Sequence, residues 1–321
     1  MKNEILNILK EADGYVSGEK ISSRLSLSRS MVWKYIKKLR EEGYVIDSVT
    51  NKGYRLDFTP DILNREIICE RSGSYFNDRE IMYVGKTEST NILAKEYSDF
   101  PDGSVFVADI QTAGRGRRGR GWHTVPGEGI YMSVLLKPEI EPDKISQITL
   151  VAGISVCTAL RDFGADAFIK WPNDIVADGK KLCGILTELS AEVERVNYLV
   201  CGMGINVHNK KFPEELADKA ISMYMHTGKI IERAEIIASV LGYFEKHYKK
   251  YISDGMSGII SDYKKMCITV GKDVEIIKPD GPVHVKAVDV DADGGLVVLS
   301  DGKRMSVKSG EVSVRGLLGY V

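Results

Sequence analysis

The chain has 321 residues, 43 % hydrophobic and 28 % charged, with a net charge of −1 at pH 7. The composition is typical of a globular protein, and the length predicts two or three domains. No apolar run reaches the ~18 residues of a membrane span and no signal peptide opens the chain, so we expect no membrane partner and a cytoplasmic location. The five cysteines and five histidines are scattered, which argues against a disulfide framework or a metal site built from protein side chains.

The first 59 residues are mildly basic, with 11 Lys and Arg against 8 Asp and Glu. Apolar spacing and serine caps predict three helices, the last from Ser28 to Arg40, followed by a hairpin that turns at residues 51–53. This order is typical of a winged helix-turn-helix, with a small protein-docking domain as the alternative. The expected DNA contacts are Ser28, Arg29, Ser30, Trp33, Lys34 and Lys37 on the third helix and Lys52 on the wing.

Two further domains are expected after residue 60. Residues 61–270 alternate strand-like and helical stretches, which predicts one large mixed α/β sheet, with an almost wholly buried helix over residues 145–162. Residues 271–321 carry short strands between frequent Asp-Gly and Pro-Asp-Gly turns, which is typical of a small SH3-like β-barrel. The predicted fold class is therefore α+β: a winged helix-turn-helix over residues 1–60, a mixed-sheet domain and a C-terminal barrel.

Residues 111–122 read Q-T-A-G-R-G-R-R-G-R-G-W between two predicted strands. Glycines and like charges cannot order this segment unaided, so we expect a mobile loop that becomes ordered around an anionic ligand. Its G-x-G-x-x-G spacing does not indicate a dinucleotide site, because a strand and not a helix follows. An RGG-like nucleic-acid segment remains an alternative, although such segments usually belong to disordered tails.

Four other clusters carry polar side chains. Ser89-Thr90-Asn91 suits a neutral polar head group, although helix capping alone is an alternative. Residues 170–174, K-W-P-N-D, set a lysine and an Asn-Asp pair on a rigid extended backbone that suits a phosphate, with an ordinary strand end as the alternative. Residues 202–206, G-M-G-I-N, are a strand end where glycines let a ligand approach closely.

The fourth cluster, residues 180–186, follows an Asp178-Gly179 turn. A tight hairpin there pairs Val176 with Lys181 and places Lys181 on the same face as Asp174, roughly 7 Å away. A solvated hairpin tip is the alternative. No G-x-S-x-G, P-loop or kinase motif and no His-Cys pair is present, so the sequence predicts a site that brings two reactants together and stabilises phosphate charge without an enzyme nucleophile.

These motifs, in this order, resemble biotin protein ligases, and the domains around them resemble the bifunctional form that also represses the biotin operon. The resemblance implies that biotin and ATP, with Mg²⁺ brought by ATP, form biotinyl-5′-AMP and pyrophosphate. Biotin then passes to a lysine of biotin carboxyl carrier protein. It also implies a ligand-promoted homodimer that binds operator DNA. A lipoate or octanoate ligase, and a ligand-sensing repressor without turnover, remain alternatives.

The resemblance also implies roles for individual residues. Lys181, Arg117 and Asp174 are the expected catalytic residues, with Asp174 assisting deprotonation of the incoming lysine. The expected biotin contacts are Ser89, Thr90, Asn91, Gln111, Arg115, Gly116, Arg117 and Lys181, and the expected nucleotide contacts are Trp122, Lys170, Asn173 and Asn206.

Overall fold

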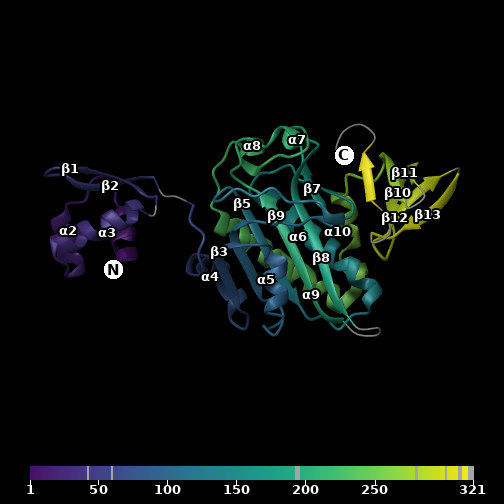
Figure 1. Cartoon of the computed structure of the whole chain (residues 1–321), viewed down its shortest axis with the longest axis horizontal. Helices are drawn as coiled ribbons and strands as arrows, with labels where there is room; N and C mark the ends of the chain where they lie inside the picture. The colour runs from purple at the N-terminus through teal and green to yellow at the C-terminus, as the bar shows by residue number, and fades with distance from the viewer. Residues whose placement is uncertain are drawn as a thin grey trace. The chain divides into compact units, whose positions relative to one another are not determined.

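The computed structural model describes residues 1–41, 43–58, 61–191, 196–278, 281–300, 302–309 and 313–316. The chain divides into two compact units, Met1–Ile62 and Leu63–Val321 (Figure 1). Each unit has its own hydrophobic core. Among the described residues, no helix is both long and apolar enough to cross a membrane.

The first unit has the predicted winged helix-turn-helix order. Its elements are α1 (Lys2–Lys10), α2 (Gly18–Leu25), α3 (Arg29–Glu41), β1 (Val45–Val49) and β2 (Gly53–Phe58), and the two strands pair antiparallel. The hydroxyl of Ser28 accepts a hydrogen bond from the Met31 amide at 3.2 Å, so it caps the start of α3 as predicted. Val32, Ile36 and Leu39 are fully buried on one face of α3, which leaves the opposite face to solvent.

The second unit is built on a seven-stranded mixed sheet in the order β3-β4-β5-β9-β8-β7-β6. β3 and β4 are parallel and the other neighbours are antiparallel. The order places β8 and β9 beside β5, so that chain segments far apart in sequence meet at the sheet centre. The strands are β3 (Ile81–Thr87), β4 (Val105–Gln111), β5 (Gly129–Leu136), β6 (Phe168–Lys170), β7 (Asp174–Ala177), β8 (Lys180–Ala191) and β9 (Val196–Asn206).

Helices cover both faces of this sheet (Figure 1). The long helices α6 (Ile145–Asp162) and α9 (Arg233–Asp254) pack together, and α6 is buried on nearly all sides, as predicted. α5 (Thr90–Glu96) packs over a separate apolar cluster that includes Phe106 and Val200. The shorter elements were not predicted from the sequence: α4 (Arg65–Ser72), α7 (Glu214–Ala217), α8 (Met223–Thr227), α10 (Ile260–Met266) and the 3-10 turns η1 (Gly73–Phe76), η2 (Arg117–Gly119), η3 (Pro142–Lys144) and η4 (Gly255–Gly258).

The C-terminal strands form an antiparallel five-stranded sheet in the order β13-β12-β11-β10-β14. The indole of Trp171 and the amide of Gln147 each donate a hydrogen bond of 3.0 Å to the carbonyls of Gly294 and Asp293 in its β11–β12 turn. This sheet therefore packs within the second compact unit, and the domain boundary predicted at residue 270 stays a prediction. The strands are β10 (Asp273–Lys278), β11 (Gly281–Val290), β12 (Leu296–Ser300), β13 (Lys303–Val307) and β14 (Ser313–Gly316).

The inward face of α3 predicts a matched pair of stability effects. Ile36→Ala should lower the free energy of unfolding by about 2–5 kcal/mol, because it leaves a cavity at a fully buried position. Trp33→Ala, on the same helix but 56 % exposed, should change it by no more than about 0.5 kcal/mol. Urea unfolding of each variant, followed by circular dichroism, measures both; equal losses would contradict the assigned faces.

Candidate functional site

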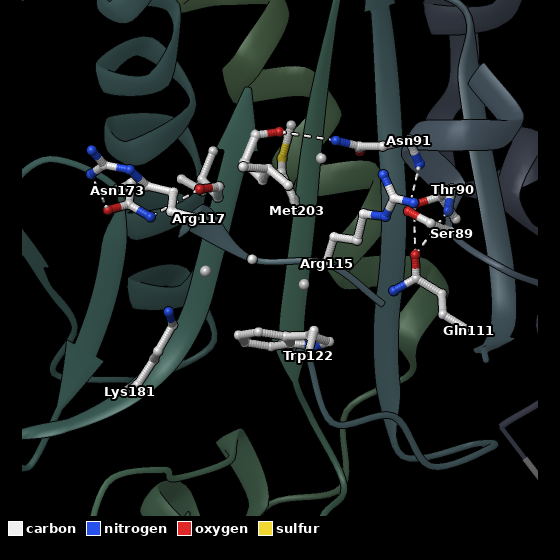
Figure 2. Close-up of a pocket in the computed structure, with 16 residues that line it drawn as sticks. Ser89, Thr90, Asn91, Gln111, Arg115, Arg117, Trp122, Asn173, Lys181 and Met203 are labelled. Atoms are coloured by element: carbon white, nitrogen blue, oxygen red, sulfur yellow. Dashed lines mark hydrogen bonds between the residues drawn. The ribbon is translucent and has the colours of Figure 1, made fainter. Parts of the chain in front are cut away.

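One pocket gathers most of the residues that the sequence predicted for the site (Figure 2). Its walls come from the start of α5, the end of β4, the glycine-arginine loop (residues 111–122) and the neighbouring strands β8 and β9. The pocket is lined by Ser89, Thr90, Asn91, Gln111, Arg115, Gly116, Arg117, Trp122, Asn173 and Lys181, together with glycines and apolar residues of β8 and β9.

One end of the pocket, the neutral end, is a network of uncharged hydrogen-bonding groups at the start of α5 (Figure 2). The main-chain N–H of Thr90 donates to Gln111 Oε1 at 2.8 Å. The buried hydroxyl of Ser133 lies 2.7 Å from both Thr90 Oγ1 and Asn91 Oδ1. Ser89 Oγ accepts from the Asn91 amide at 3.3 Å, so the helix-capping interpretation of Ser89 is confirmed and the hydroxyl still lines the pocket.

The opposite end carries cations (Figure 2). Lys181 Nζ lies 2.7 Å from Asp174 Oδ1, so the prediction that they share one patch is confirmed. Arg117 donates to Asn173 Oδ1 at 3.2 Å and also to the main-chain carbonyl of Ser309. Burial lowers the pKa of the Arg117 guanidinium, whereas the Asp174 carboxylate acts in the opposite direction. The cationic end can therefore hold an anionic group of a ligand between Lys181 and Arg117.

A β-bulge shapes the cationic end. Val176 pairs with Lys181 as predicted, but Asp174 pairs with Gly184 because the register shifts between Ile175 and Val176. The extra residue on β8 changes the ladder between the two charged positions, which is a typical effect of a bulge. The direct contact replaces the ~7 Å diagonal expected from an unbroken hairpin.

Trp122 lies between the two ends, on a floor of glycines in β8 and β9 (Figure 2). A Cβ added at Gly204 would stand 2.6 Å from the Trp122 ring, and one at Gly184 would stand 2.8 Å from it. Lys181 Nζ is 5.4 Å from the ring centroid, within cation–π range. The indole N–H is buried, and no described residue accepts a hydrogen bond from it. Only glycine at these positions lets the ring lie against the sheet.

The glycine-arginine loop folds back on itself as an irregular hairpin. The Trp122 amide donates to the Gly114 carbonyl at 2.9 Å, and the Gly116 amide donates to the Arg120 carbonyl at 2.7 Å. Arg118 and Gly119 make the turn with left-handed φ of 57° and 73°, a region that glycine adopts without steric cost. The expectation that an anion orders this loop stays a prediction.

A buried arginine that sequence analysis did not select holds the base of this loop. Arg233, at the start of α9, is 1 % exposed. Its guanidinium donates to Asp109 Oδ1 at 2.8 Å and to the Gly129 carbonyl at 3.1 Å. These two acceptors lie on the strands that lead into and out of the loop, so Arg233 fixes both of its ends. No local motif marks this residue, because its partners are more than 100 positions away in sequence.

Three predicted residues are not part of the pocket lining. Lys170 is buried and is the ladder partner of Asp174 in the pairing of β6 with β7. Asp174 contacts the site through its ion pair with Lys181. The amide of Asn206 donates to the carbonyls of Lys181, at 3.4 Å, and Ile221, at 3.0 Å. The structure thus gives Asn206 a role in supporting the Lys181 backbone, and its contact with a nucleotide stays a prediction.

The predicted DNA-binding residues all lie at the surface of the first unit. Lys37 Nζ is 5.9 Å from the centroid of the Trp33 ring, and Arg29 forms an ion pair of 2.9 Å with Glu19. The exposed set comprises Ser28, Arg29, Ser30, Trp33, Lys34, Lys37 and Lys52.

The fold and the site are those of a biotin protein ligase, as comparison with known proteins shows. Residues 83–206 match the Biotin/lipoate A/B protein ligase family, residues 2–55 match an HTH domain, and residues 269–315 match the Biotin protein ligase C terminal domain. A solved biotin protein ligase from Aquifex aeolicus, in complex with biotin and ATP, is similar over 74 % of this chain and 99 % of its own, with 32 % identity and a TM-score of 0.68.

Full-length relatives narrow the class. The chain is 35 % identical to the bifunctional ligase/repressor BirA of Bacillus subtilis (strain 168), over 98 % of each protein. It is 28 % identical to the protein of the same description from Escherichia coli (strain K12), over 93 % of this chain and 92 % of that one. The chain therefore belongs to the BirA family of bifunctional ligase/repressors.

The glycine floor under Trp122 predicts the effect of a single added methyl group. Gly204→Ala should weaken nucleotide binding at least about tenfold, because the new Cβ displaces the indole from the sheet. Gly121→Ala is the matched control, since its Cβ would meet only the Gly114 carbonyl, at 4.0 Å. Titration calorimetry with ATP measures both variants; equal affinities would show that the Trp122 position does not matter.

Proposed function

We propose that this protein is an ATP-dependent biotin protein ligase and a biotin-responsive repressor of transcription. It would form biotinyl-5′-AMP and transfer biotin to a lysine of biotin carboxyl carrier protein. One observation carries the ligase function: a single pocket has a neutral hydrogen-bonding end and a cationic end, under a loop rich in arginine. A molecule with a neutral polar ring at one end and an acyl phosphate at the other matches both ends.

We assign the neutral end to the biotin head group, held by Ser89, Thr90, Asn91 and Gln111. These side chains offer hydroxyls and amides, which suit an uncharged ring that both donates and accepts hydrogen bonds. Arg115 and Gly116 line the pocket from the loop side and would close over the acyl phosphate, with Trp122 and Asn173 towards the nucleotide. Lys170 and Asn206 would support the nucleotide side from behind.

The first half-reaction needs charge stabilisation and no enzyme nucleophile. A carboxylate oxygen of biotin attacks the α-phosphorus of ATP, and the bond to pyrophosphate breaks with its electron pair leaving on pyrophosphate. Lys181 and Arg117 would neutralise the carboxylate and the phosphoryl oxygens as these approach each other. No described group of three or more His, Cys, Asp or Glu side chains could hold a metal, so we propose that Mg²⁺ arrives on the ATP phosphates.

The second half-reaction transfers the biotinyl group. A neutral lysine amine of the carrier protein attacks the acyl carbon, and the bond to AMP breaks with its electron pair leaving on AMP. The amine must lose a proton, and Asp174, at 2.7 Å from Lys181, is the carboxylate that we propose assists this loss.

The repressor function rests on the exposed basic face of α3 and on the wing. We propose that biotinyl-5′-AMP promotes a homodimer, which places two such faces on the two halves of an operator.

The test of the ligase function is ATP–pyrophosphate exchange, run separately with biotin, lipoate and octanoate. Exchange with biotin alone is expected. Exchange only with lipoate or octanoate would indicate a lipoate or octanoate ligase. No exchange with any of the three acids would indicate a ligand-sensing repressor without turnover.

Arg117→Gly should release the adenylate from a site that still binds biotin. The substitution removes a charge-assisted contact worth about 1.5–3 kcal/mol, so the dissociation rate of the adenylate should rise roughly 10–150-fold. Rapid filtration after single-turnover loading measures the retained adenylate, and titration with biotin alone is the control. Undiminished retention would contradict the assignment of Arg117 to the acyl phosphate.

Lys34→Ala should weaken DNA binding to all sequences by similar factors. Loss of one phosphate contact should also reduce the slope of log K against log salt by about one. Fluorescence anisotropy at several salt concentrations measures this, and biotin ligation by the same variant should be unchanged. An unchanged slope would remove Lys34 from the DNA-binding surface.

A further inference from the structure

We propose that Glu188 is a positioning residue that sets the hydrogen-bond polarity of the neutral end, so that Thr90 faces the ligand as an acceptor and selects a head group with an N–H. Glu188 is on β8 and does not line the pocket. The proposal rests on the proposed function, since it takes the cyclic urea of biotin as the head group.

Glu188 is an obligatory acceptor. Its Oε1 accepts from Lys95 Nζ at 2.7 Å, and its Oε2 accepts from Asn91 Nδ2 at 2.7 Å. Burial raises the pKa of Glu188, but the hydrogen bonds from Lys95 and Asn91 outweigh burial and hold the pKa below its ordinary value. An ionised carboxylate has no hydrogen to donate, so the Asn91 group that faces it must be the NH₂.

The same constraint fixes the rest of the Asn91 side chain. The Asn91 amide nitrogen also lies 3.3 Å from the carbonyl of Leu186, which is again only an acceptor. Both neighbours of the nitrogen therefore demand hydrogens, and a flipped amide would put oxygen against oxygen at both. Asn91 is 4 % exposed, and a Cβ at Gly202 would stand 2.1 Å from its Oδ1, so the amide is held tightly against β9.

Ser133 passes this orientation on to Thr90. The Ser133 hydroxyl lies 2.7 Å from Asn91 Oδ1 and 2.7 Å from Thr90 Oγ1, but it has a single hydrogen. Asn91 Oδ1 cannot donate, so the Ser133 hydrogen must go to it, and Thr90 gives its own hydrogen to Ser133 Oγ. Gln111 Oε1 accepts from the Thr90 main-chain N–H at 2.8 Å and has a second lone pair 3.2 Å from Thr90 Oγ1, but Ser133 Oγ is the closer acceptor for the Thr90 hydroxyl, at 2.7 Å.

The pocket therefore faces the ligand with a lone pair on Thr90 and the NH₂ of Gln111. A cyclic urea supplies an N–H to the first and a carbonyl to the second. A dithiolane ring or a methyl terminus supplies neither, and would leave both groups desolvated without partners, which is a strong basis for rejection. In this way a carboxylate outside the pocket determines which acyl group the pocket accepts.

The test compares Glu188→Gln with a matched control, Lys95→Met, by titration calorimetry with biotin in the absence of ATP. Glu188→Gln keeps the shape but can offer either an oxygen or an NH₂ to Asn91, so biotin should bind about tenfold more weakly. Lys95→Met removes the partner cation and leaves the acceptor, so its affinity should stay within about twofold of wild type. ATP affinity should be unchanged in both.

A double-mutant cycle separates this relay from a general structural effect. If Glu188 acts through Thr90, Glu188→Gln should cost little further affinity in a Thr90→Val background, because no hydroxyl remains to be oriented. An undiminished tenfold loss in that background, or less than twofold loss in the single variant, would overturn the proposal while leaving biotin as the substrate. If Glu188→Gln does not fold, Ser133→Ala interrupts the same series of hydrogen bonds and replaces Glu188→Gln in the double-mutant cycle. Failure of the wild-type protein to bind biotin would overturn the proposed function itself.

Discussion

The geometry of the site depends on one buried guanidinium. Arg233 lies under the sheet end and binds both Asp109, ahead of the glycine-arginine loop, and the carbonyl of Gly129, beyond it. A buried cation is tolerated only when it is paired and hydrogen-bonded, and here the Asp109 carboxylate and the Gly129 carbonyl accept from the guanidinium. Between Gly114 and Gly121 the loop has no apolar side chain to bury, so its position depends on these two anchored strands and on the packing of Trp122 against the sheet. Gln111, two residues after Asp109, is placed by the same contact.

Within the pocket, Lys181 and Arg117 lie apart from the uncharged hydrogen-bonding groups along the sheet. Neutral amides and hydroxyls gather at the start of α5, Lys181 and Arg117 gather near β7, and Trp122 lies between them (Figure 2). Arg115 is the exception, because its guanidinium lies beside Ser89, Thr90 and Asn91 at the neutral end (Figure 2). Glycines at positions 184 and 204 make the arrangement possible, because they leave the surface of the sheet flat beneath the indole.

The sequence predicted the parts of this architecture that follow from local rules. The Ser28 cap, the inward face of α3 and the pairing of Val176 with Lys181 all depend on residues close together in the chain. Which residues line the site could be predicted because the motifs resemble those of a known family.

Long-range and packing features could not be read in this way. Arg233 and Glu188 act on residues about 100 positions away, and Ser133 is a single serine in a buried, mostly apolar strand. The bulge in β8 is a one-residue register shift with no marker in the sequence. Asn206 has a supporting contact that the strand end did not indicate, because its amide nitrogen donates to main-chain carbonyls, and its predicted nucleotide contact stays a prediction.

The turn between β11 and β12 has a consequence for how such proteins can evolve by recombination of gene segments. Its carbonyls accept hydrogen bonds from Trp171 and Gln147, so loss of the C-terminal strands would leave buried donors without acceptors. Met1–Ile62, by contrast, closes around its own core. A lineage could therefore gain or lose the DNA-binding end in one fusion or deletion, while the C-terminal end must be inherited together with the enzyme.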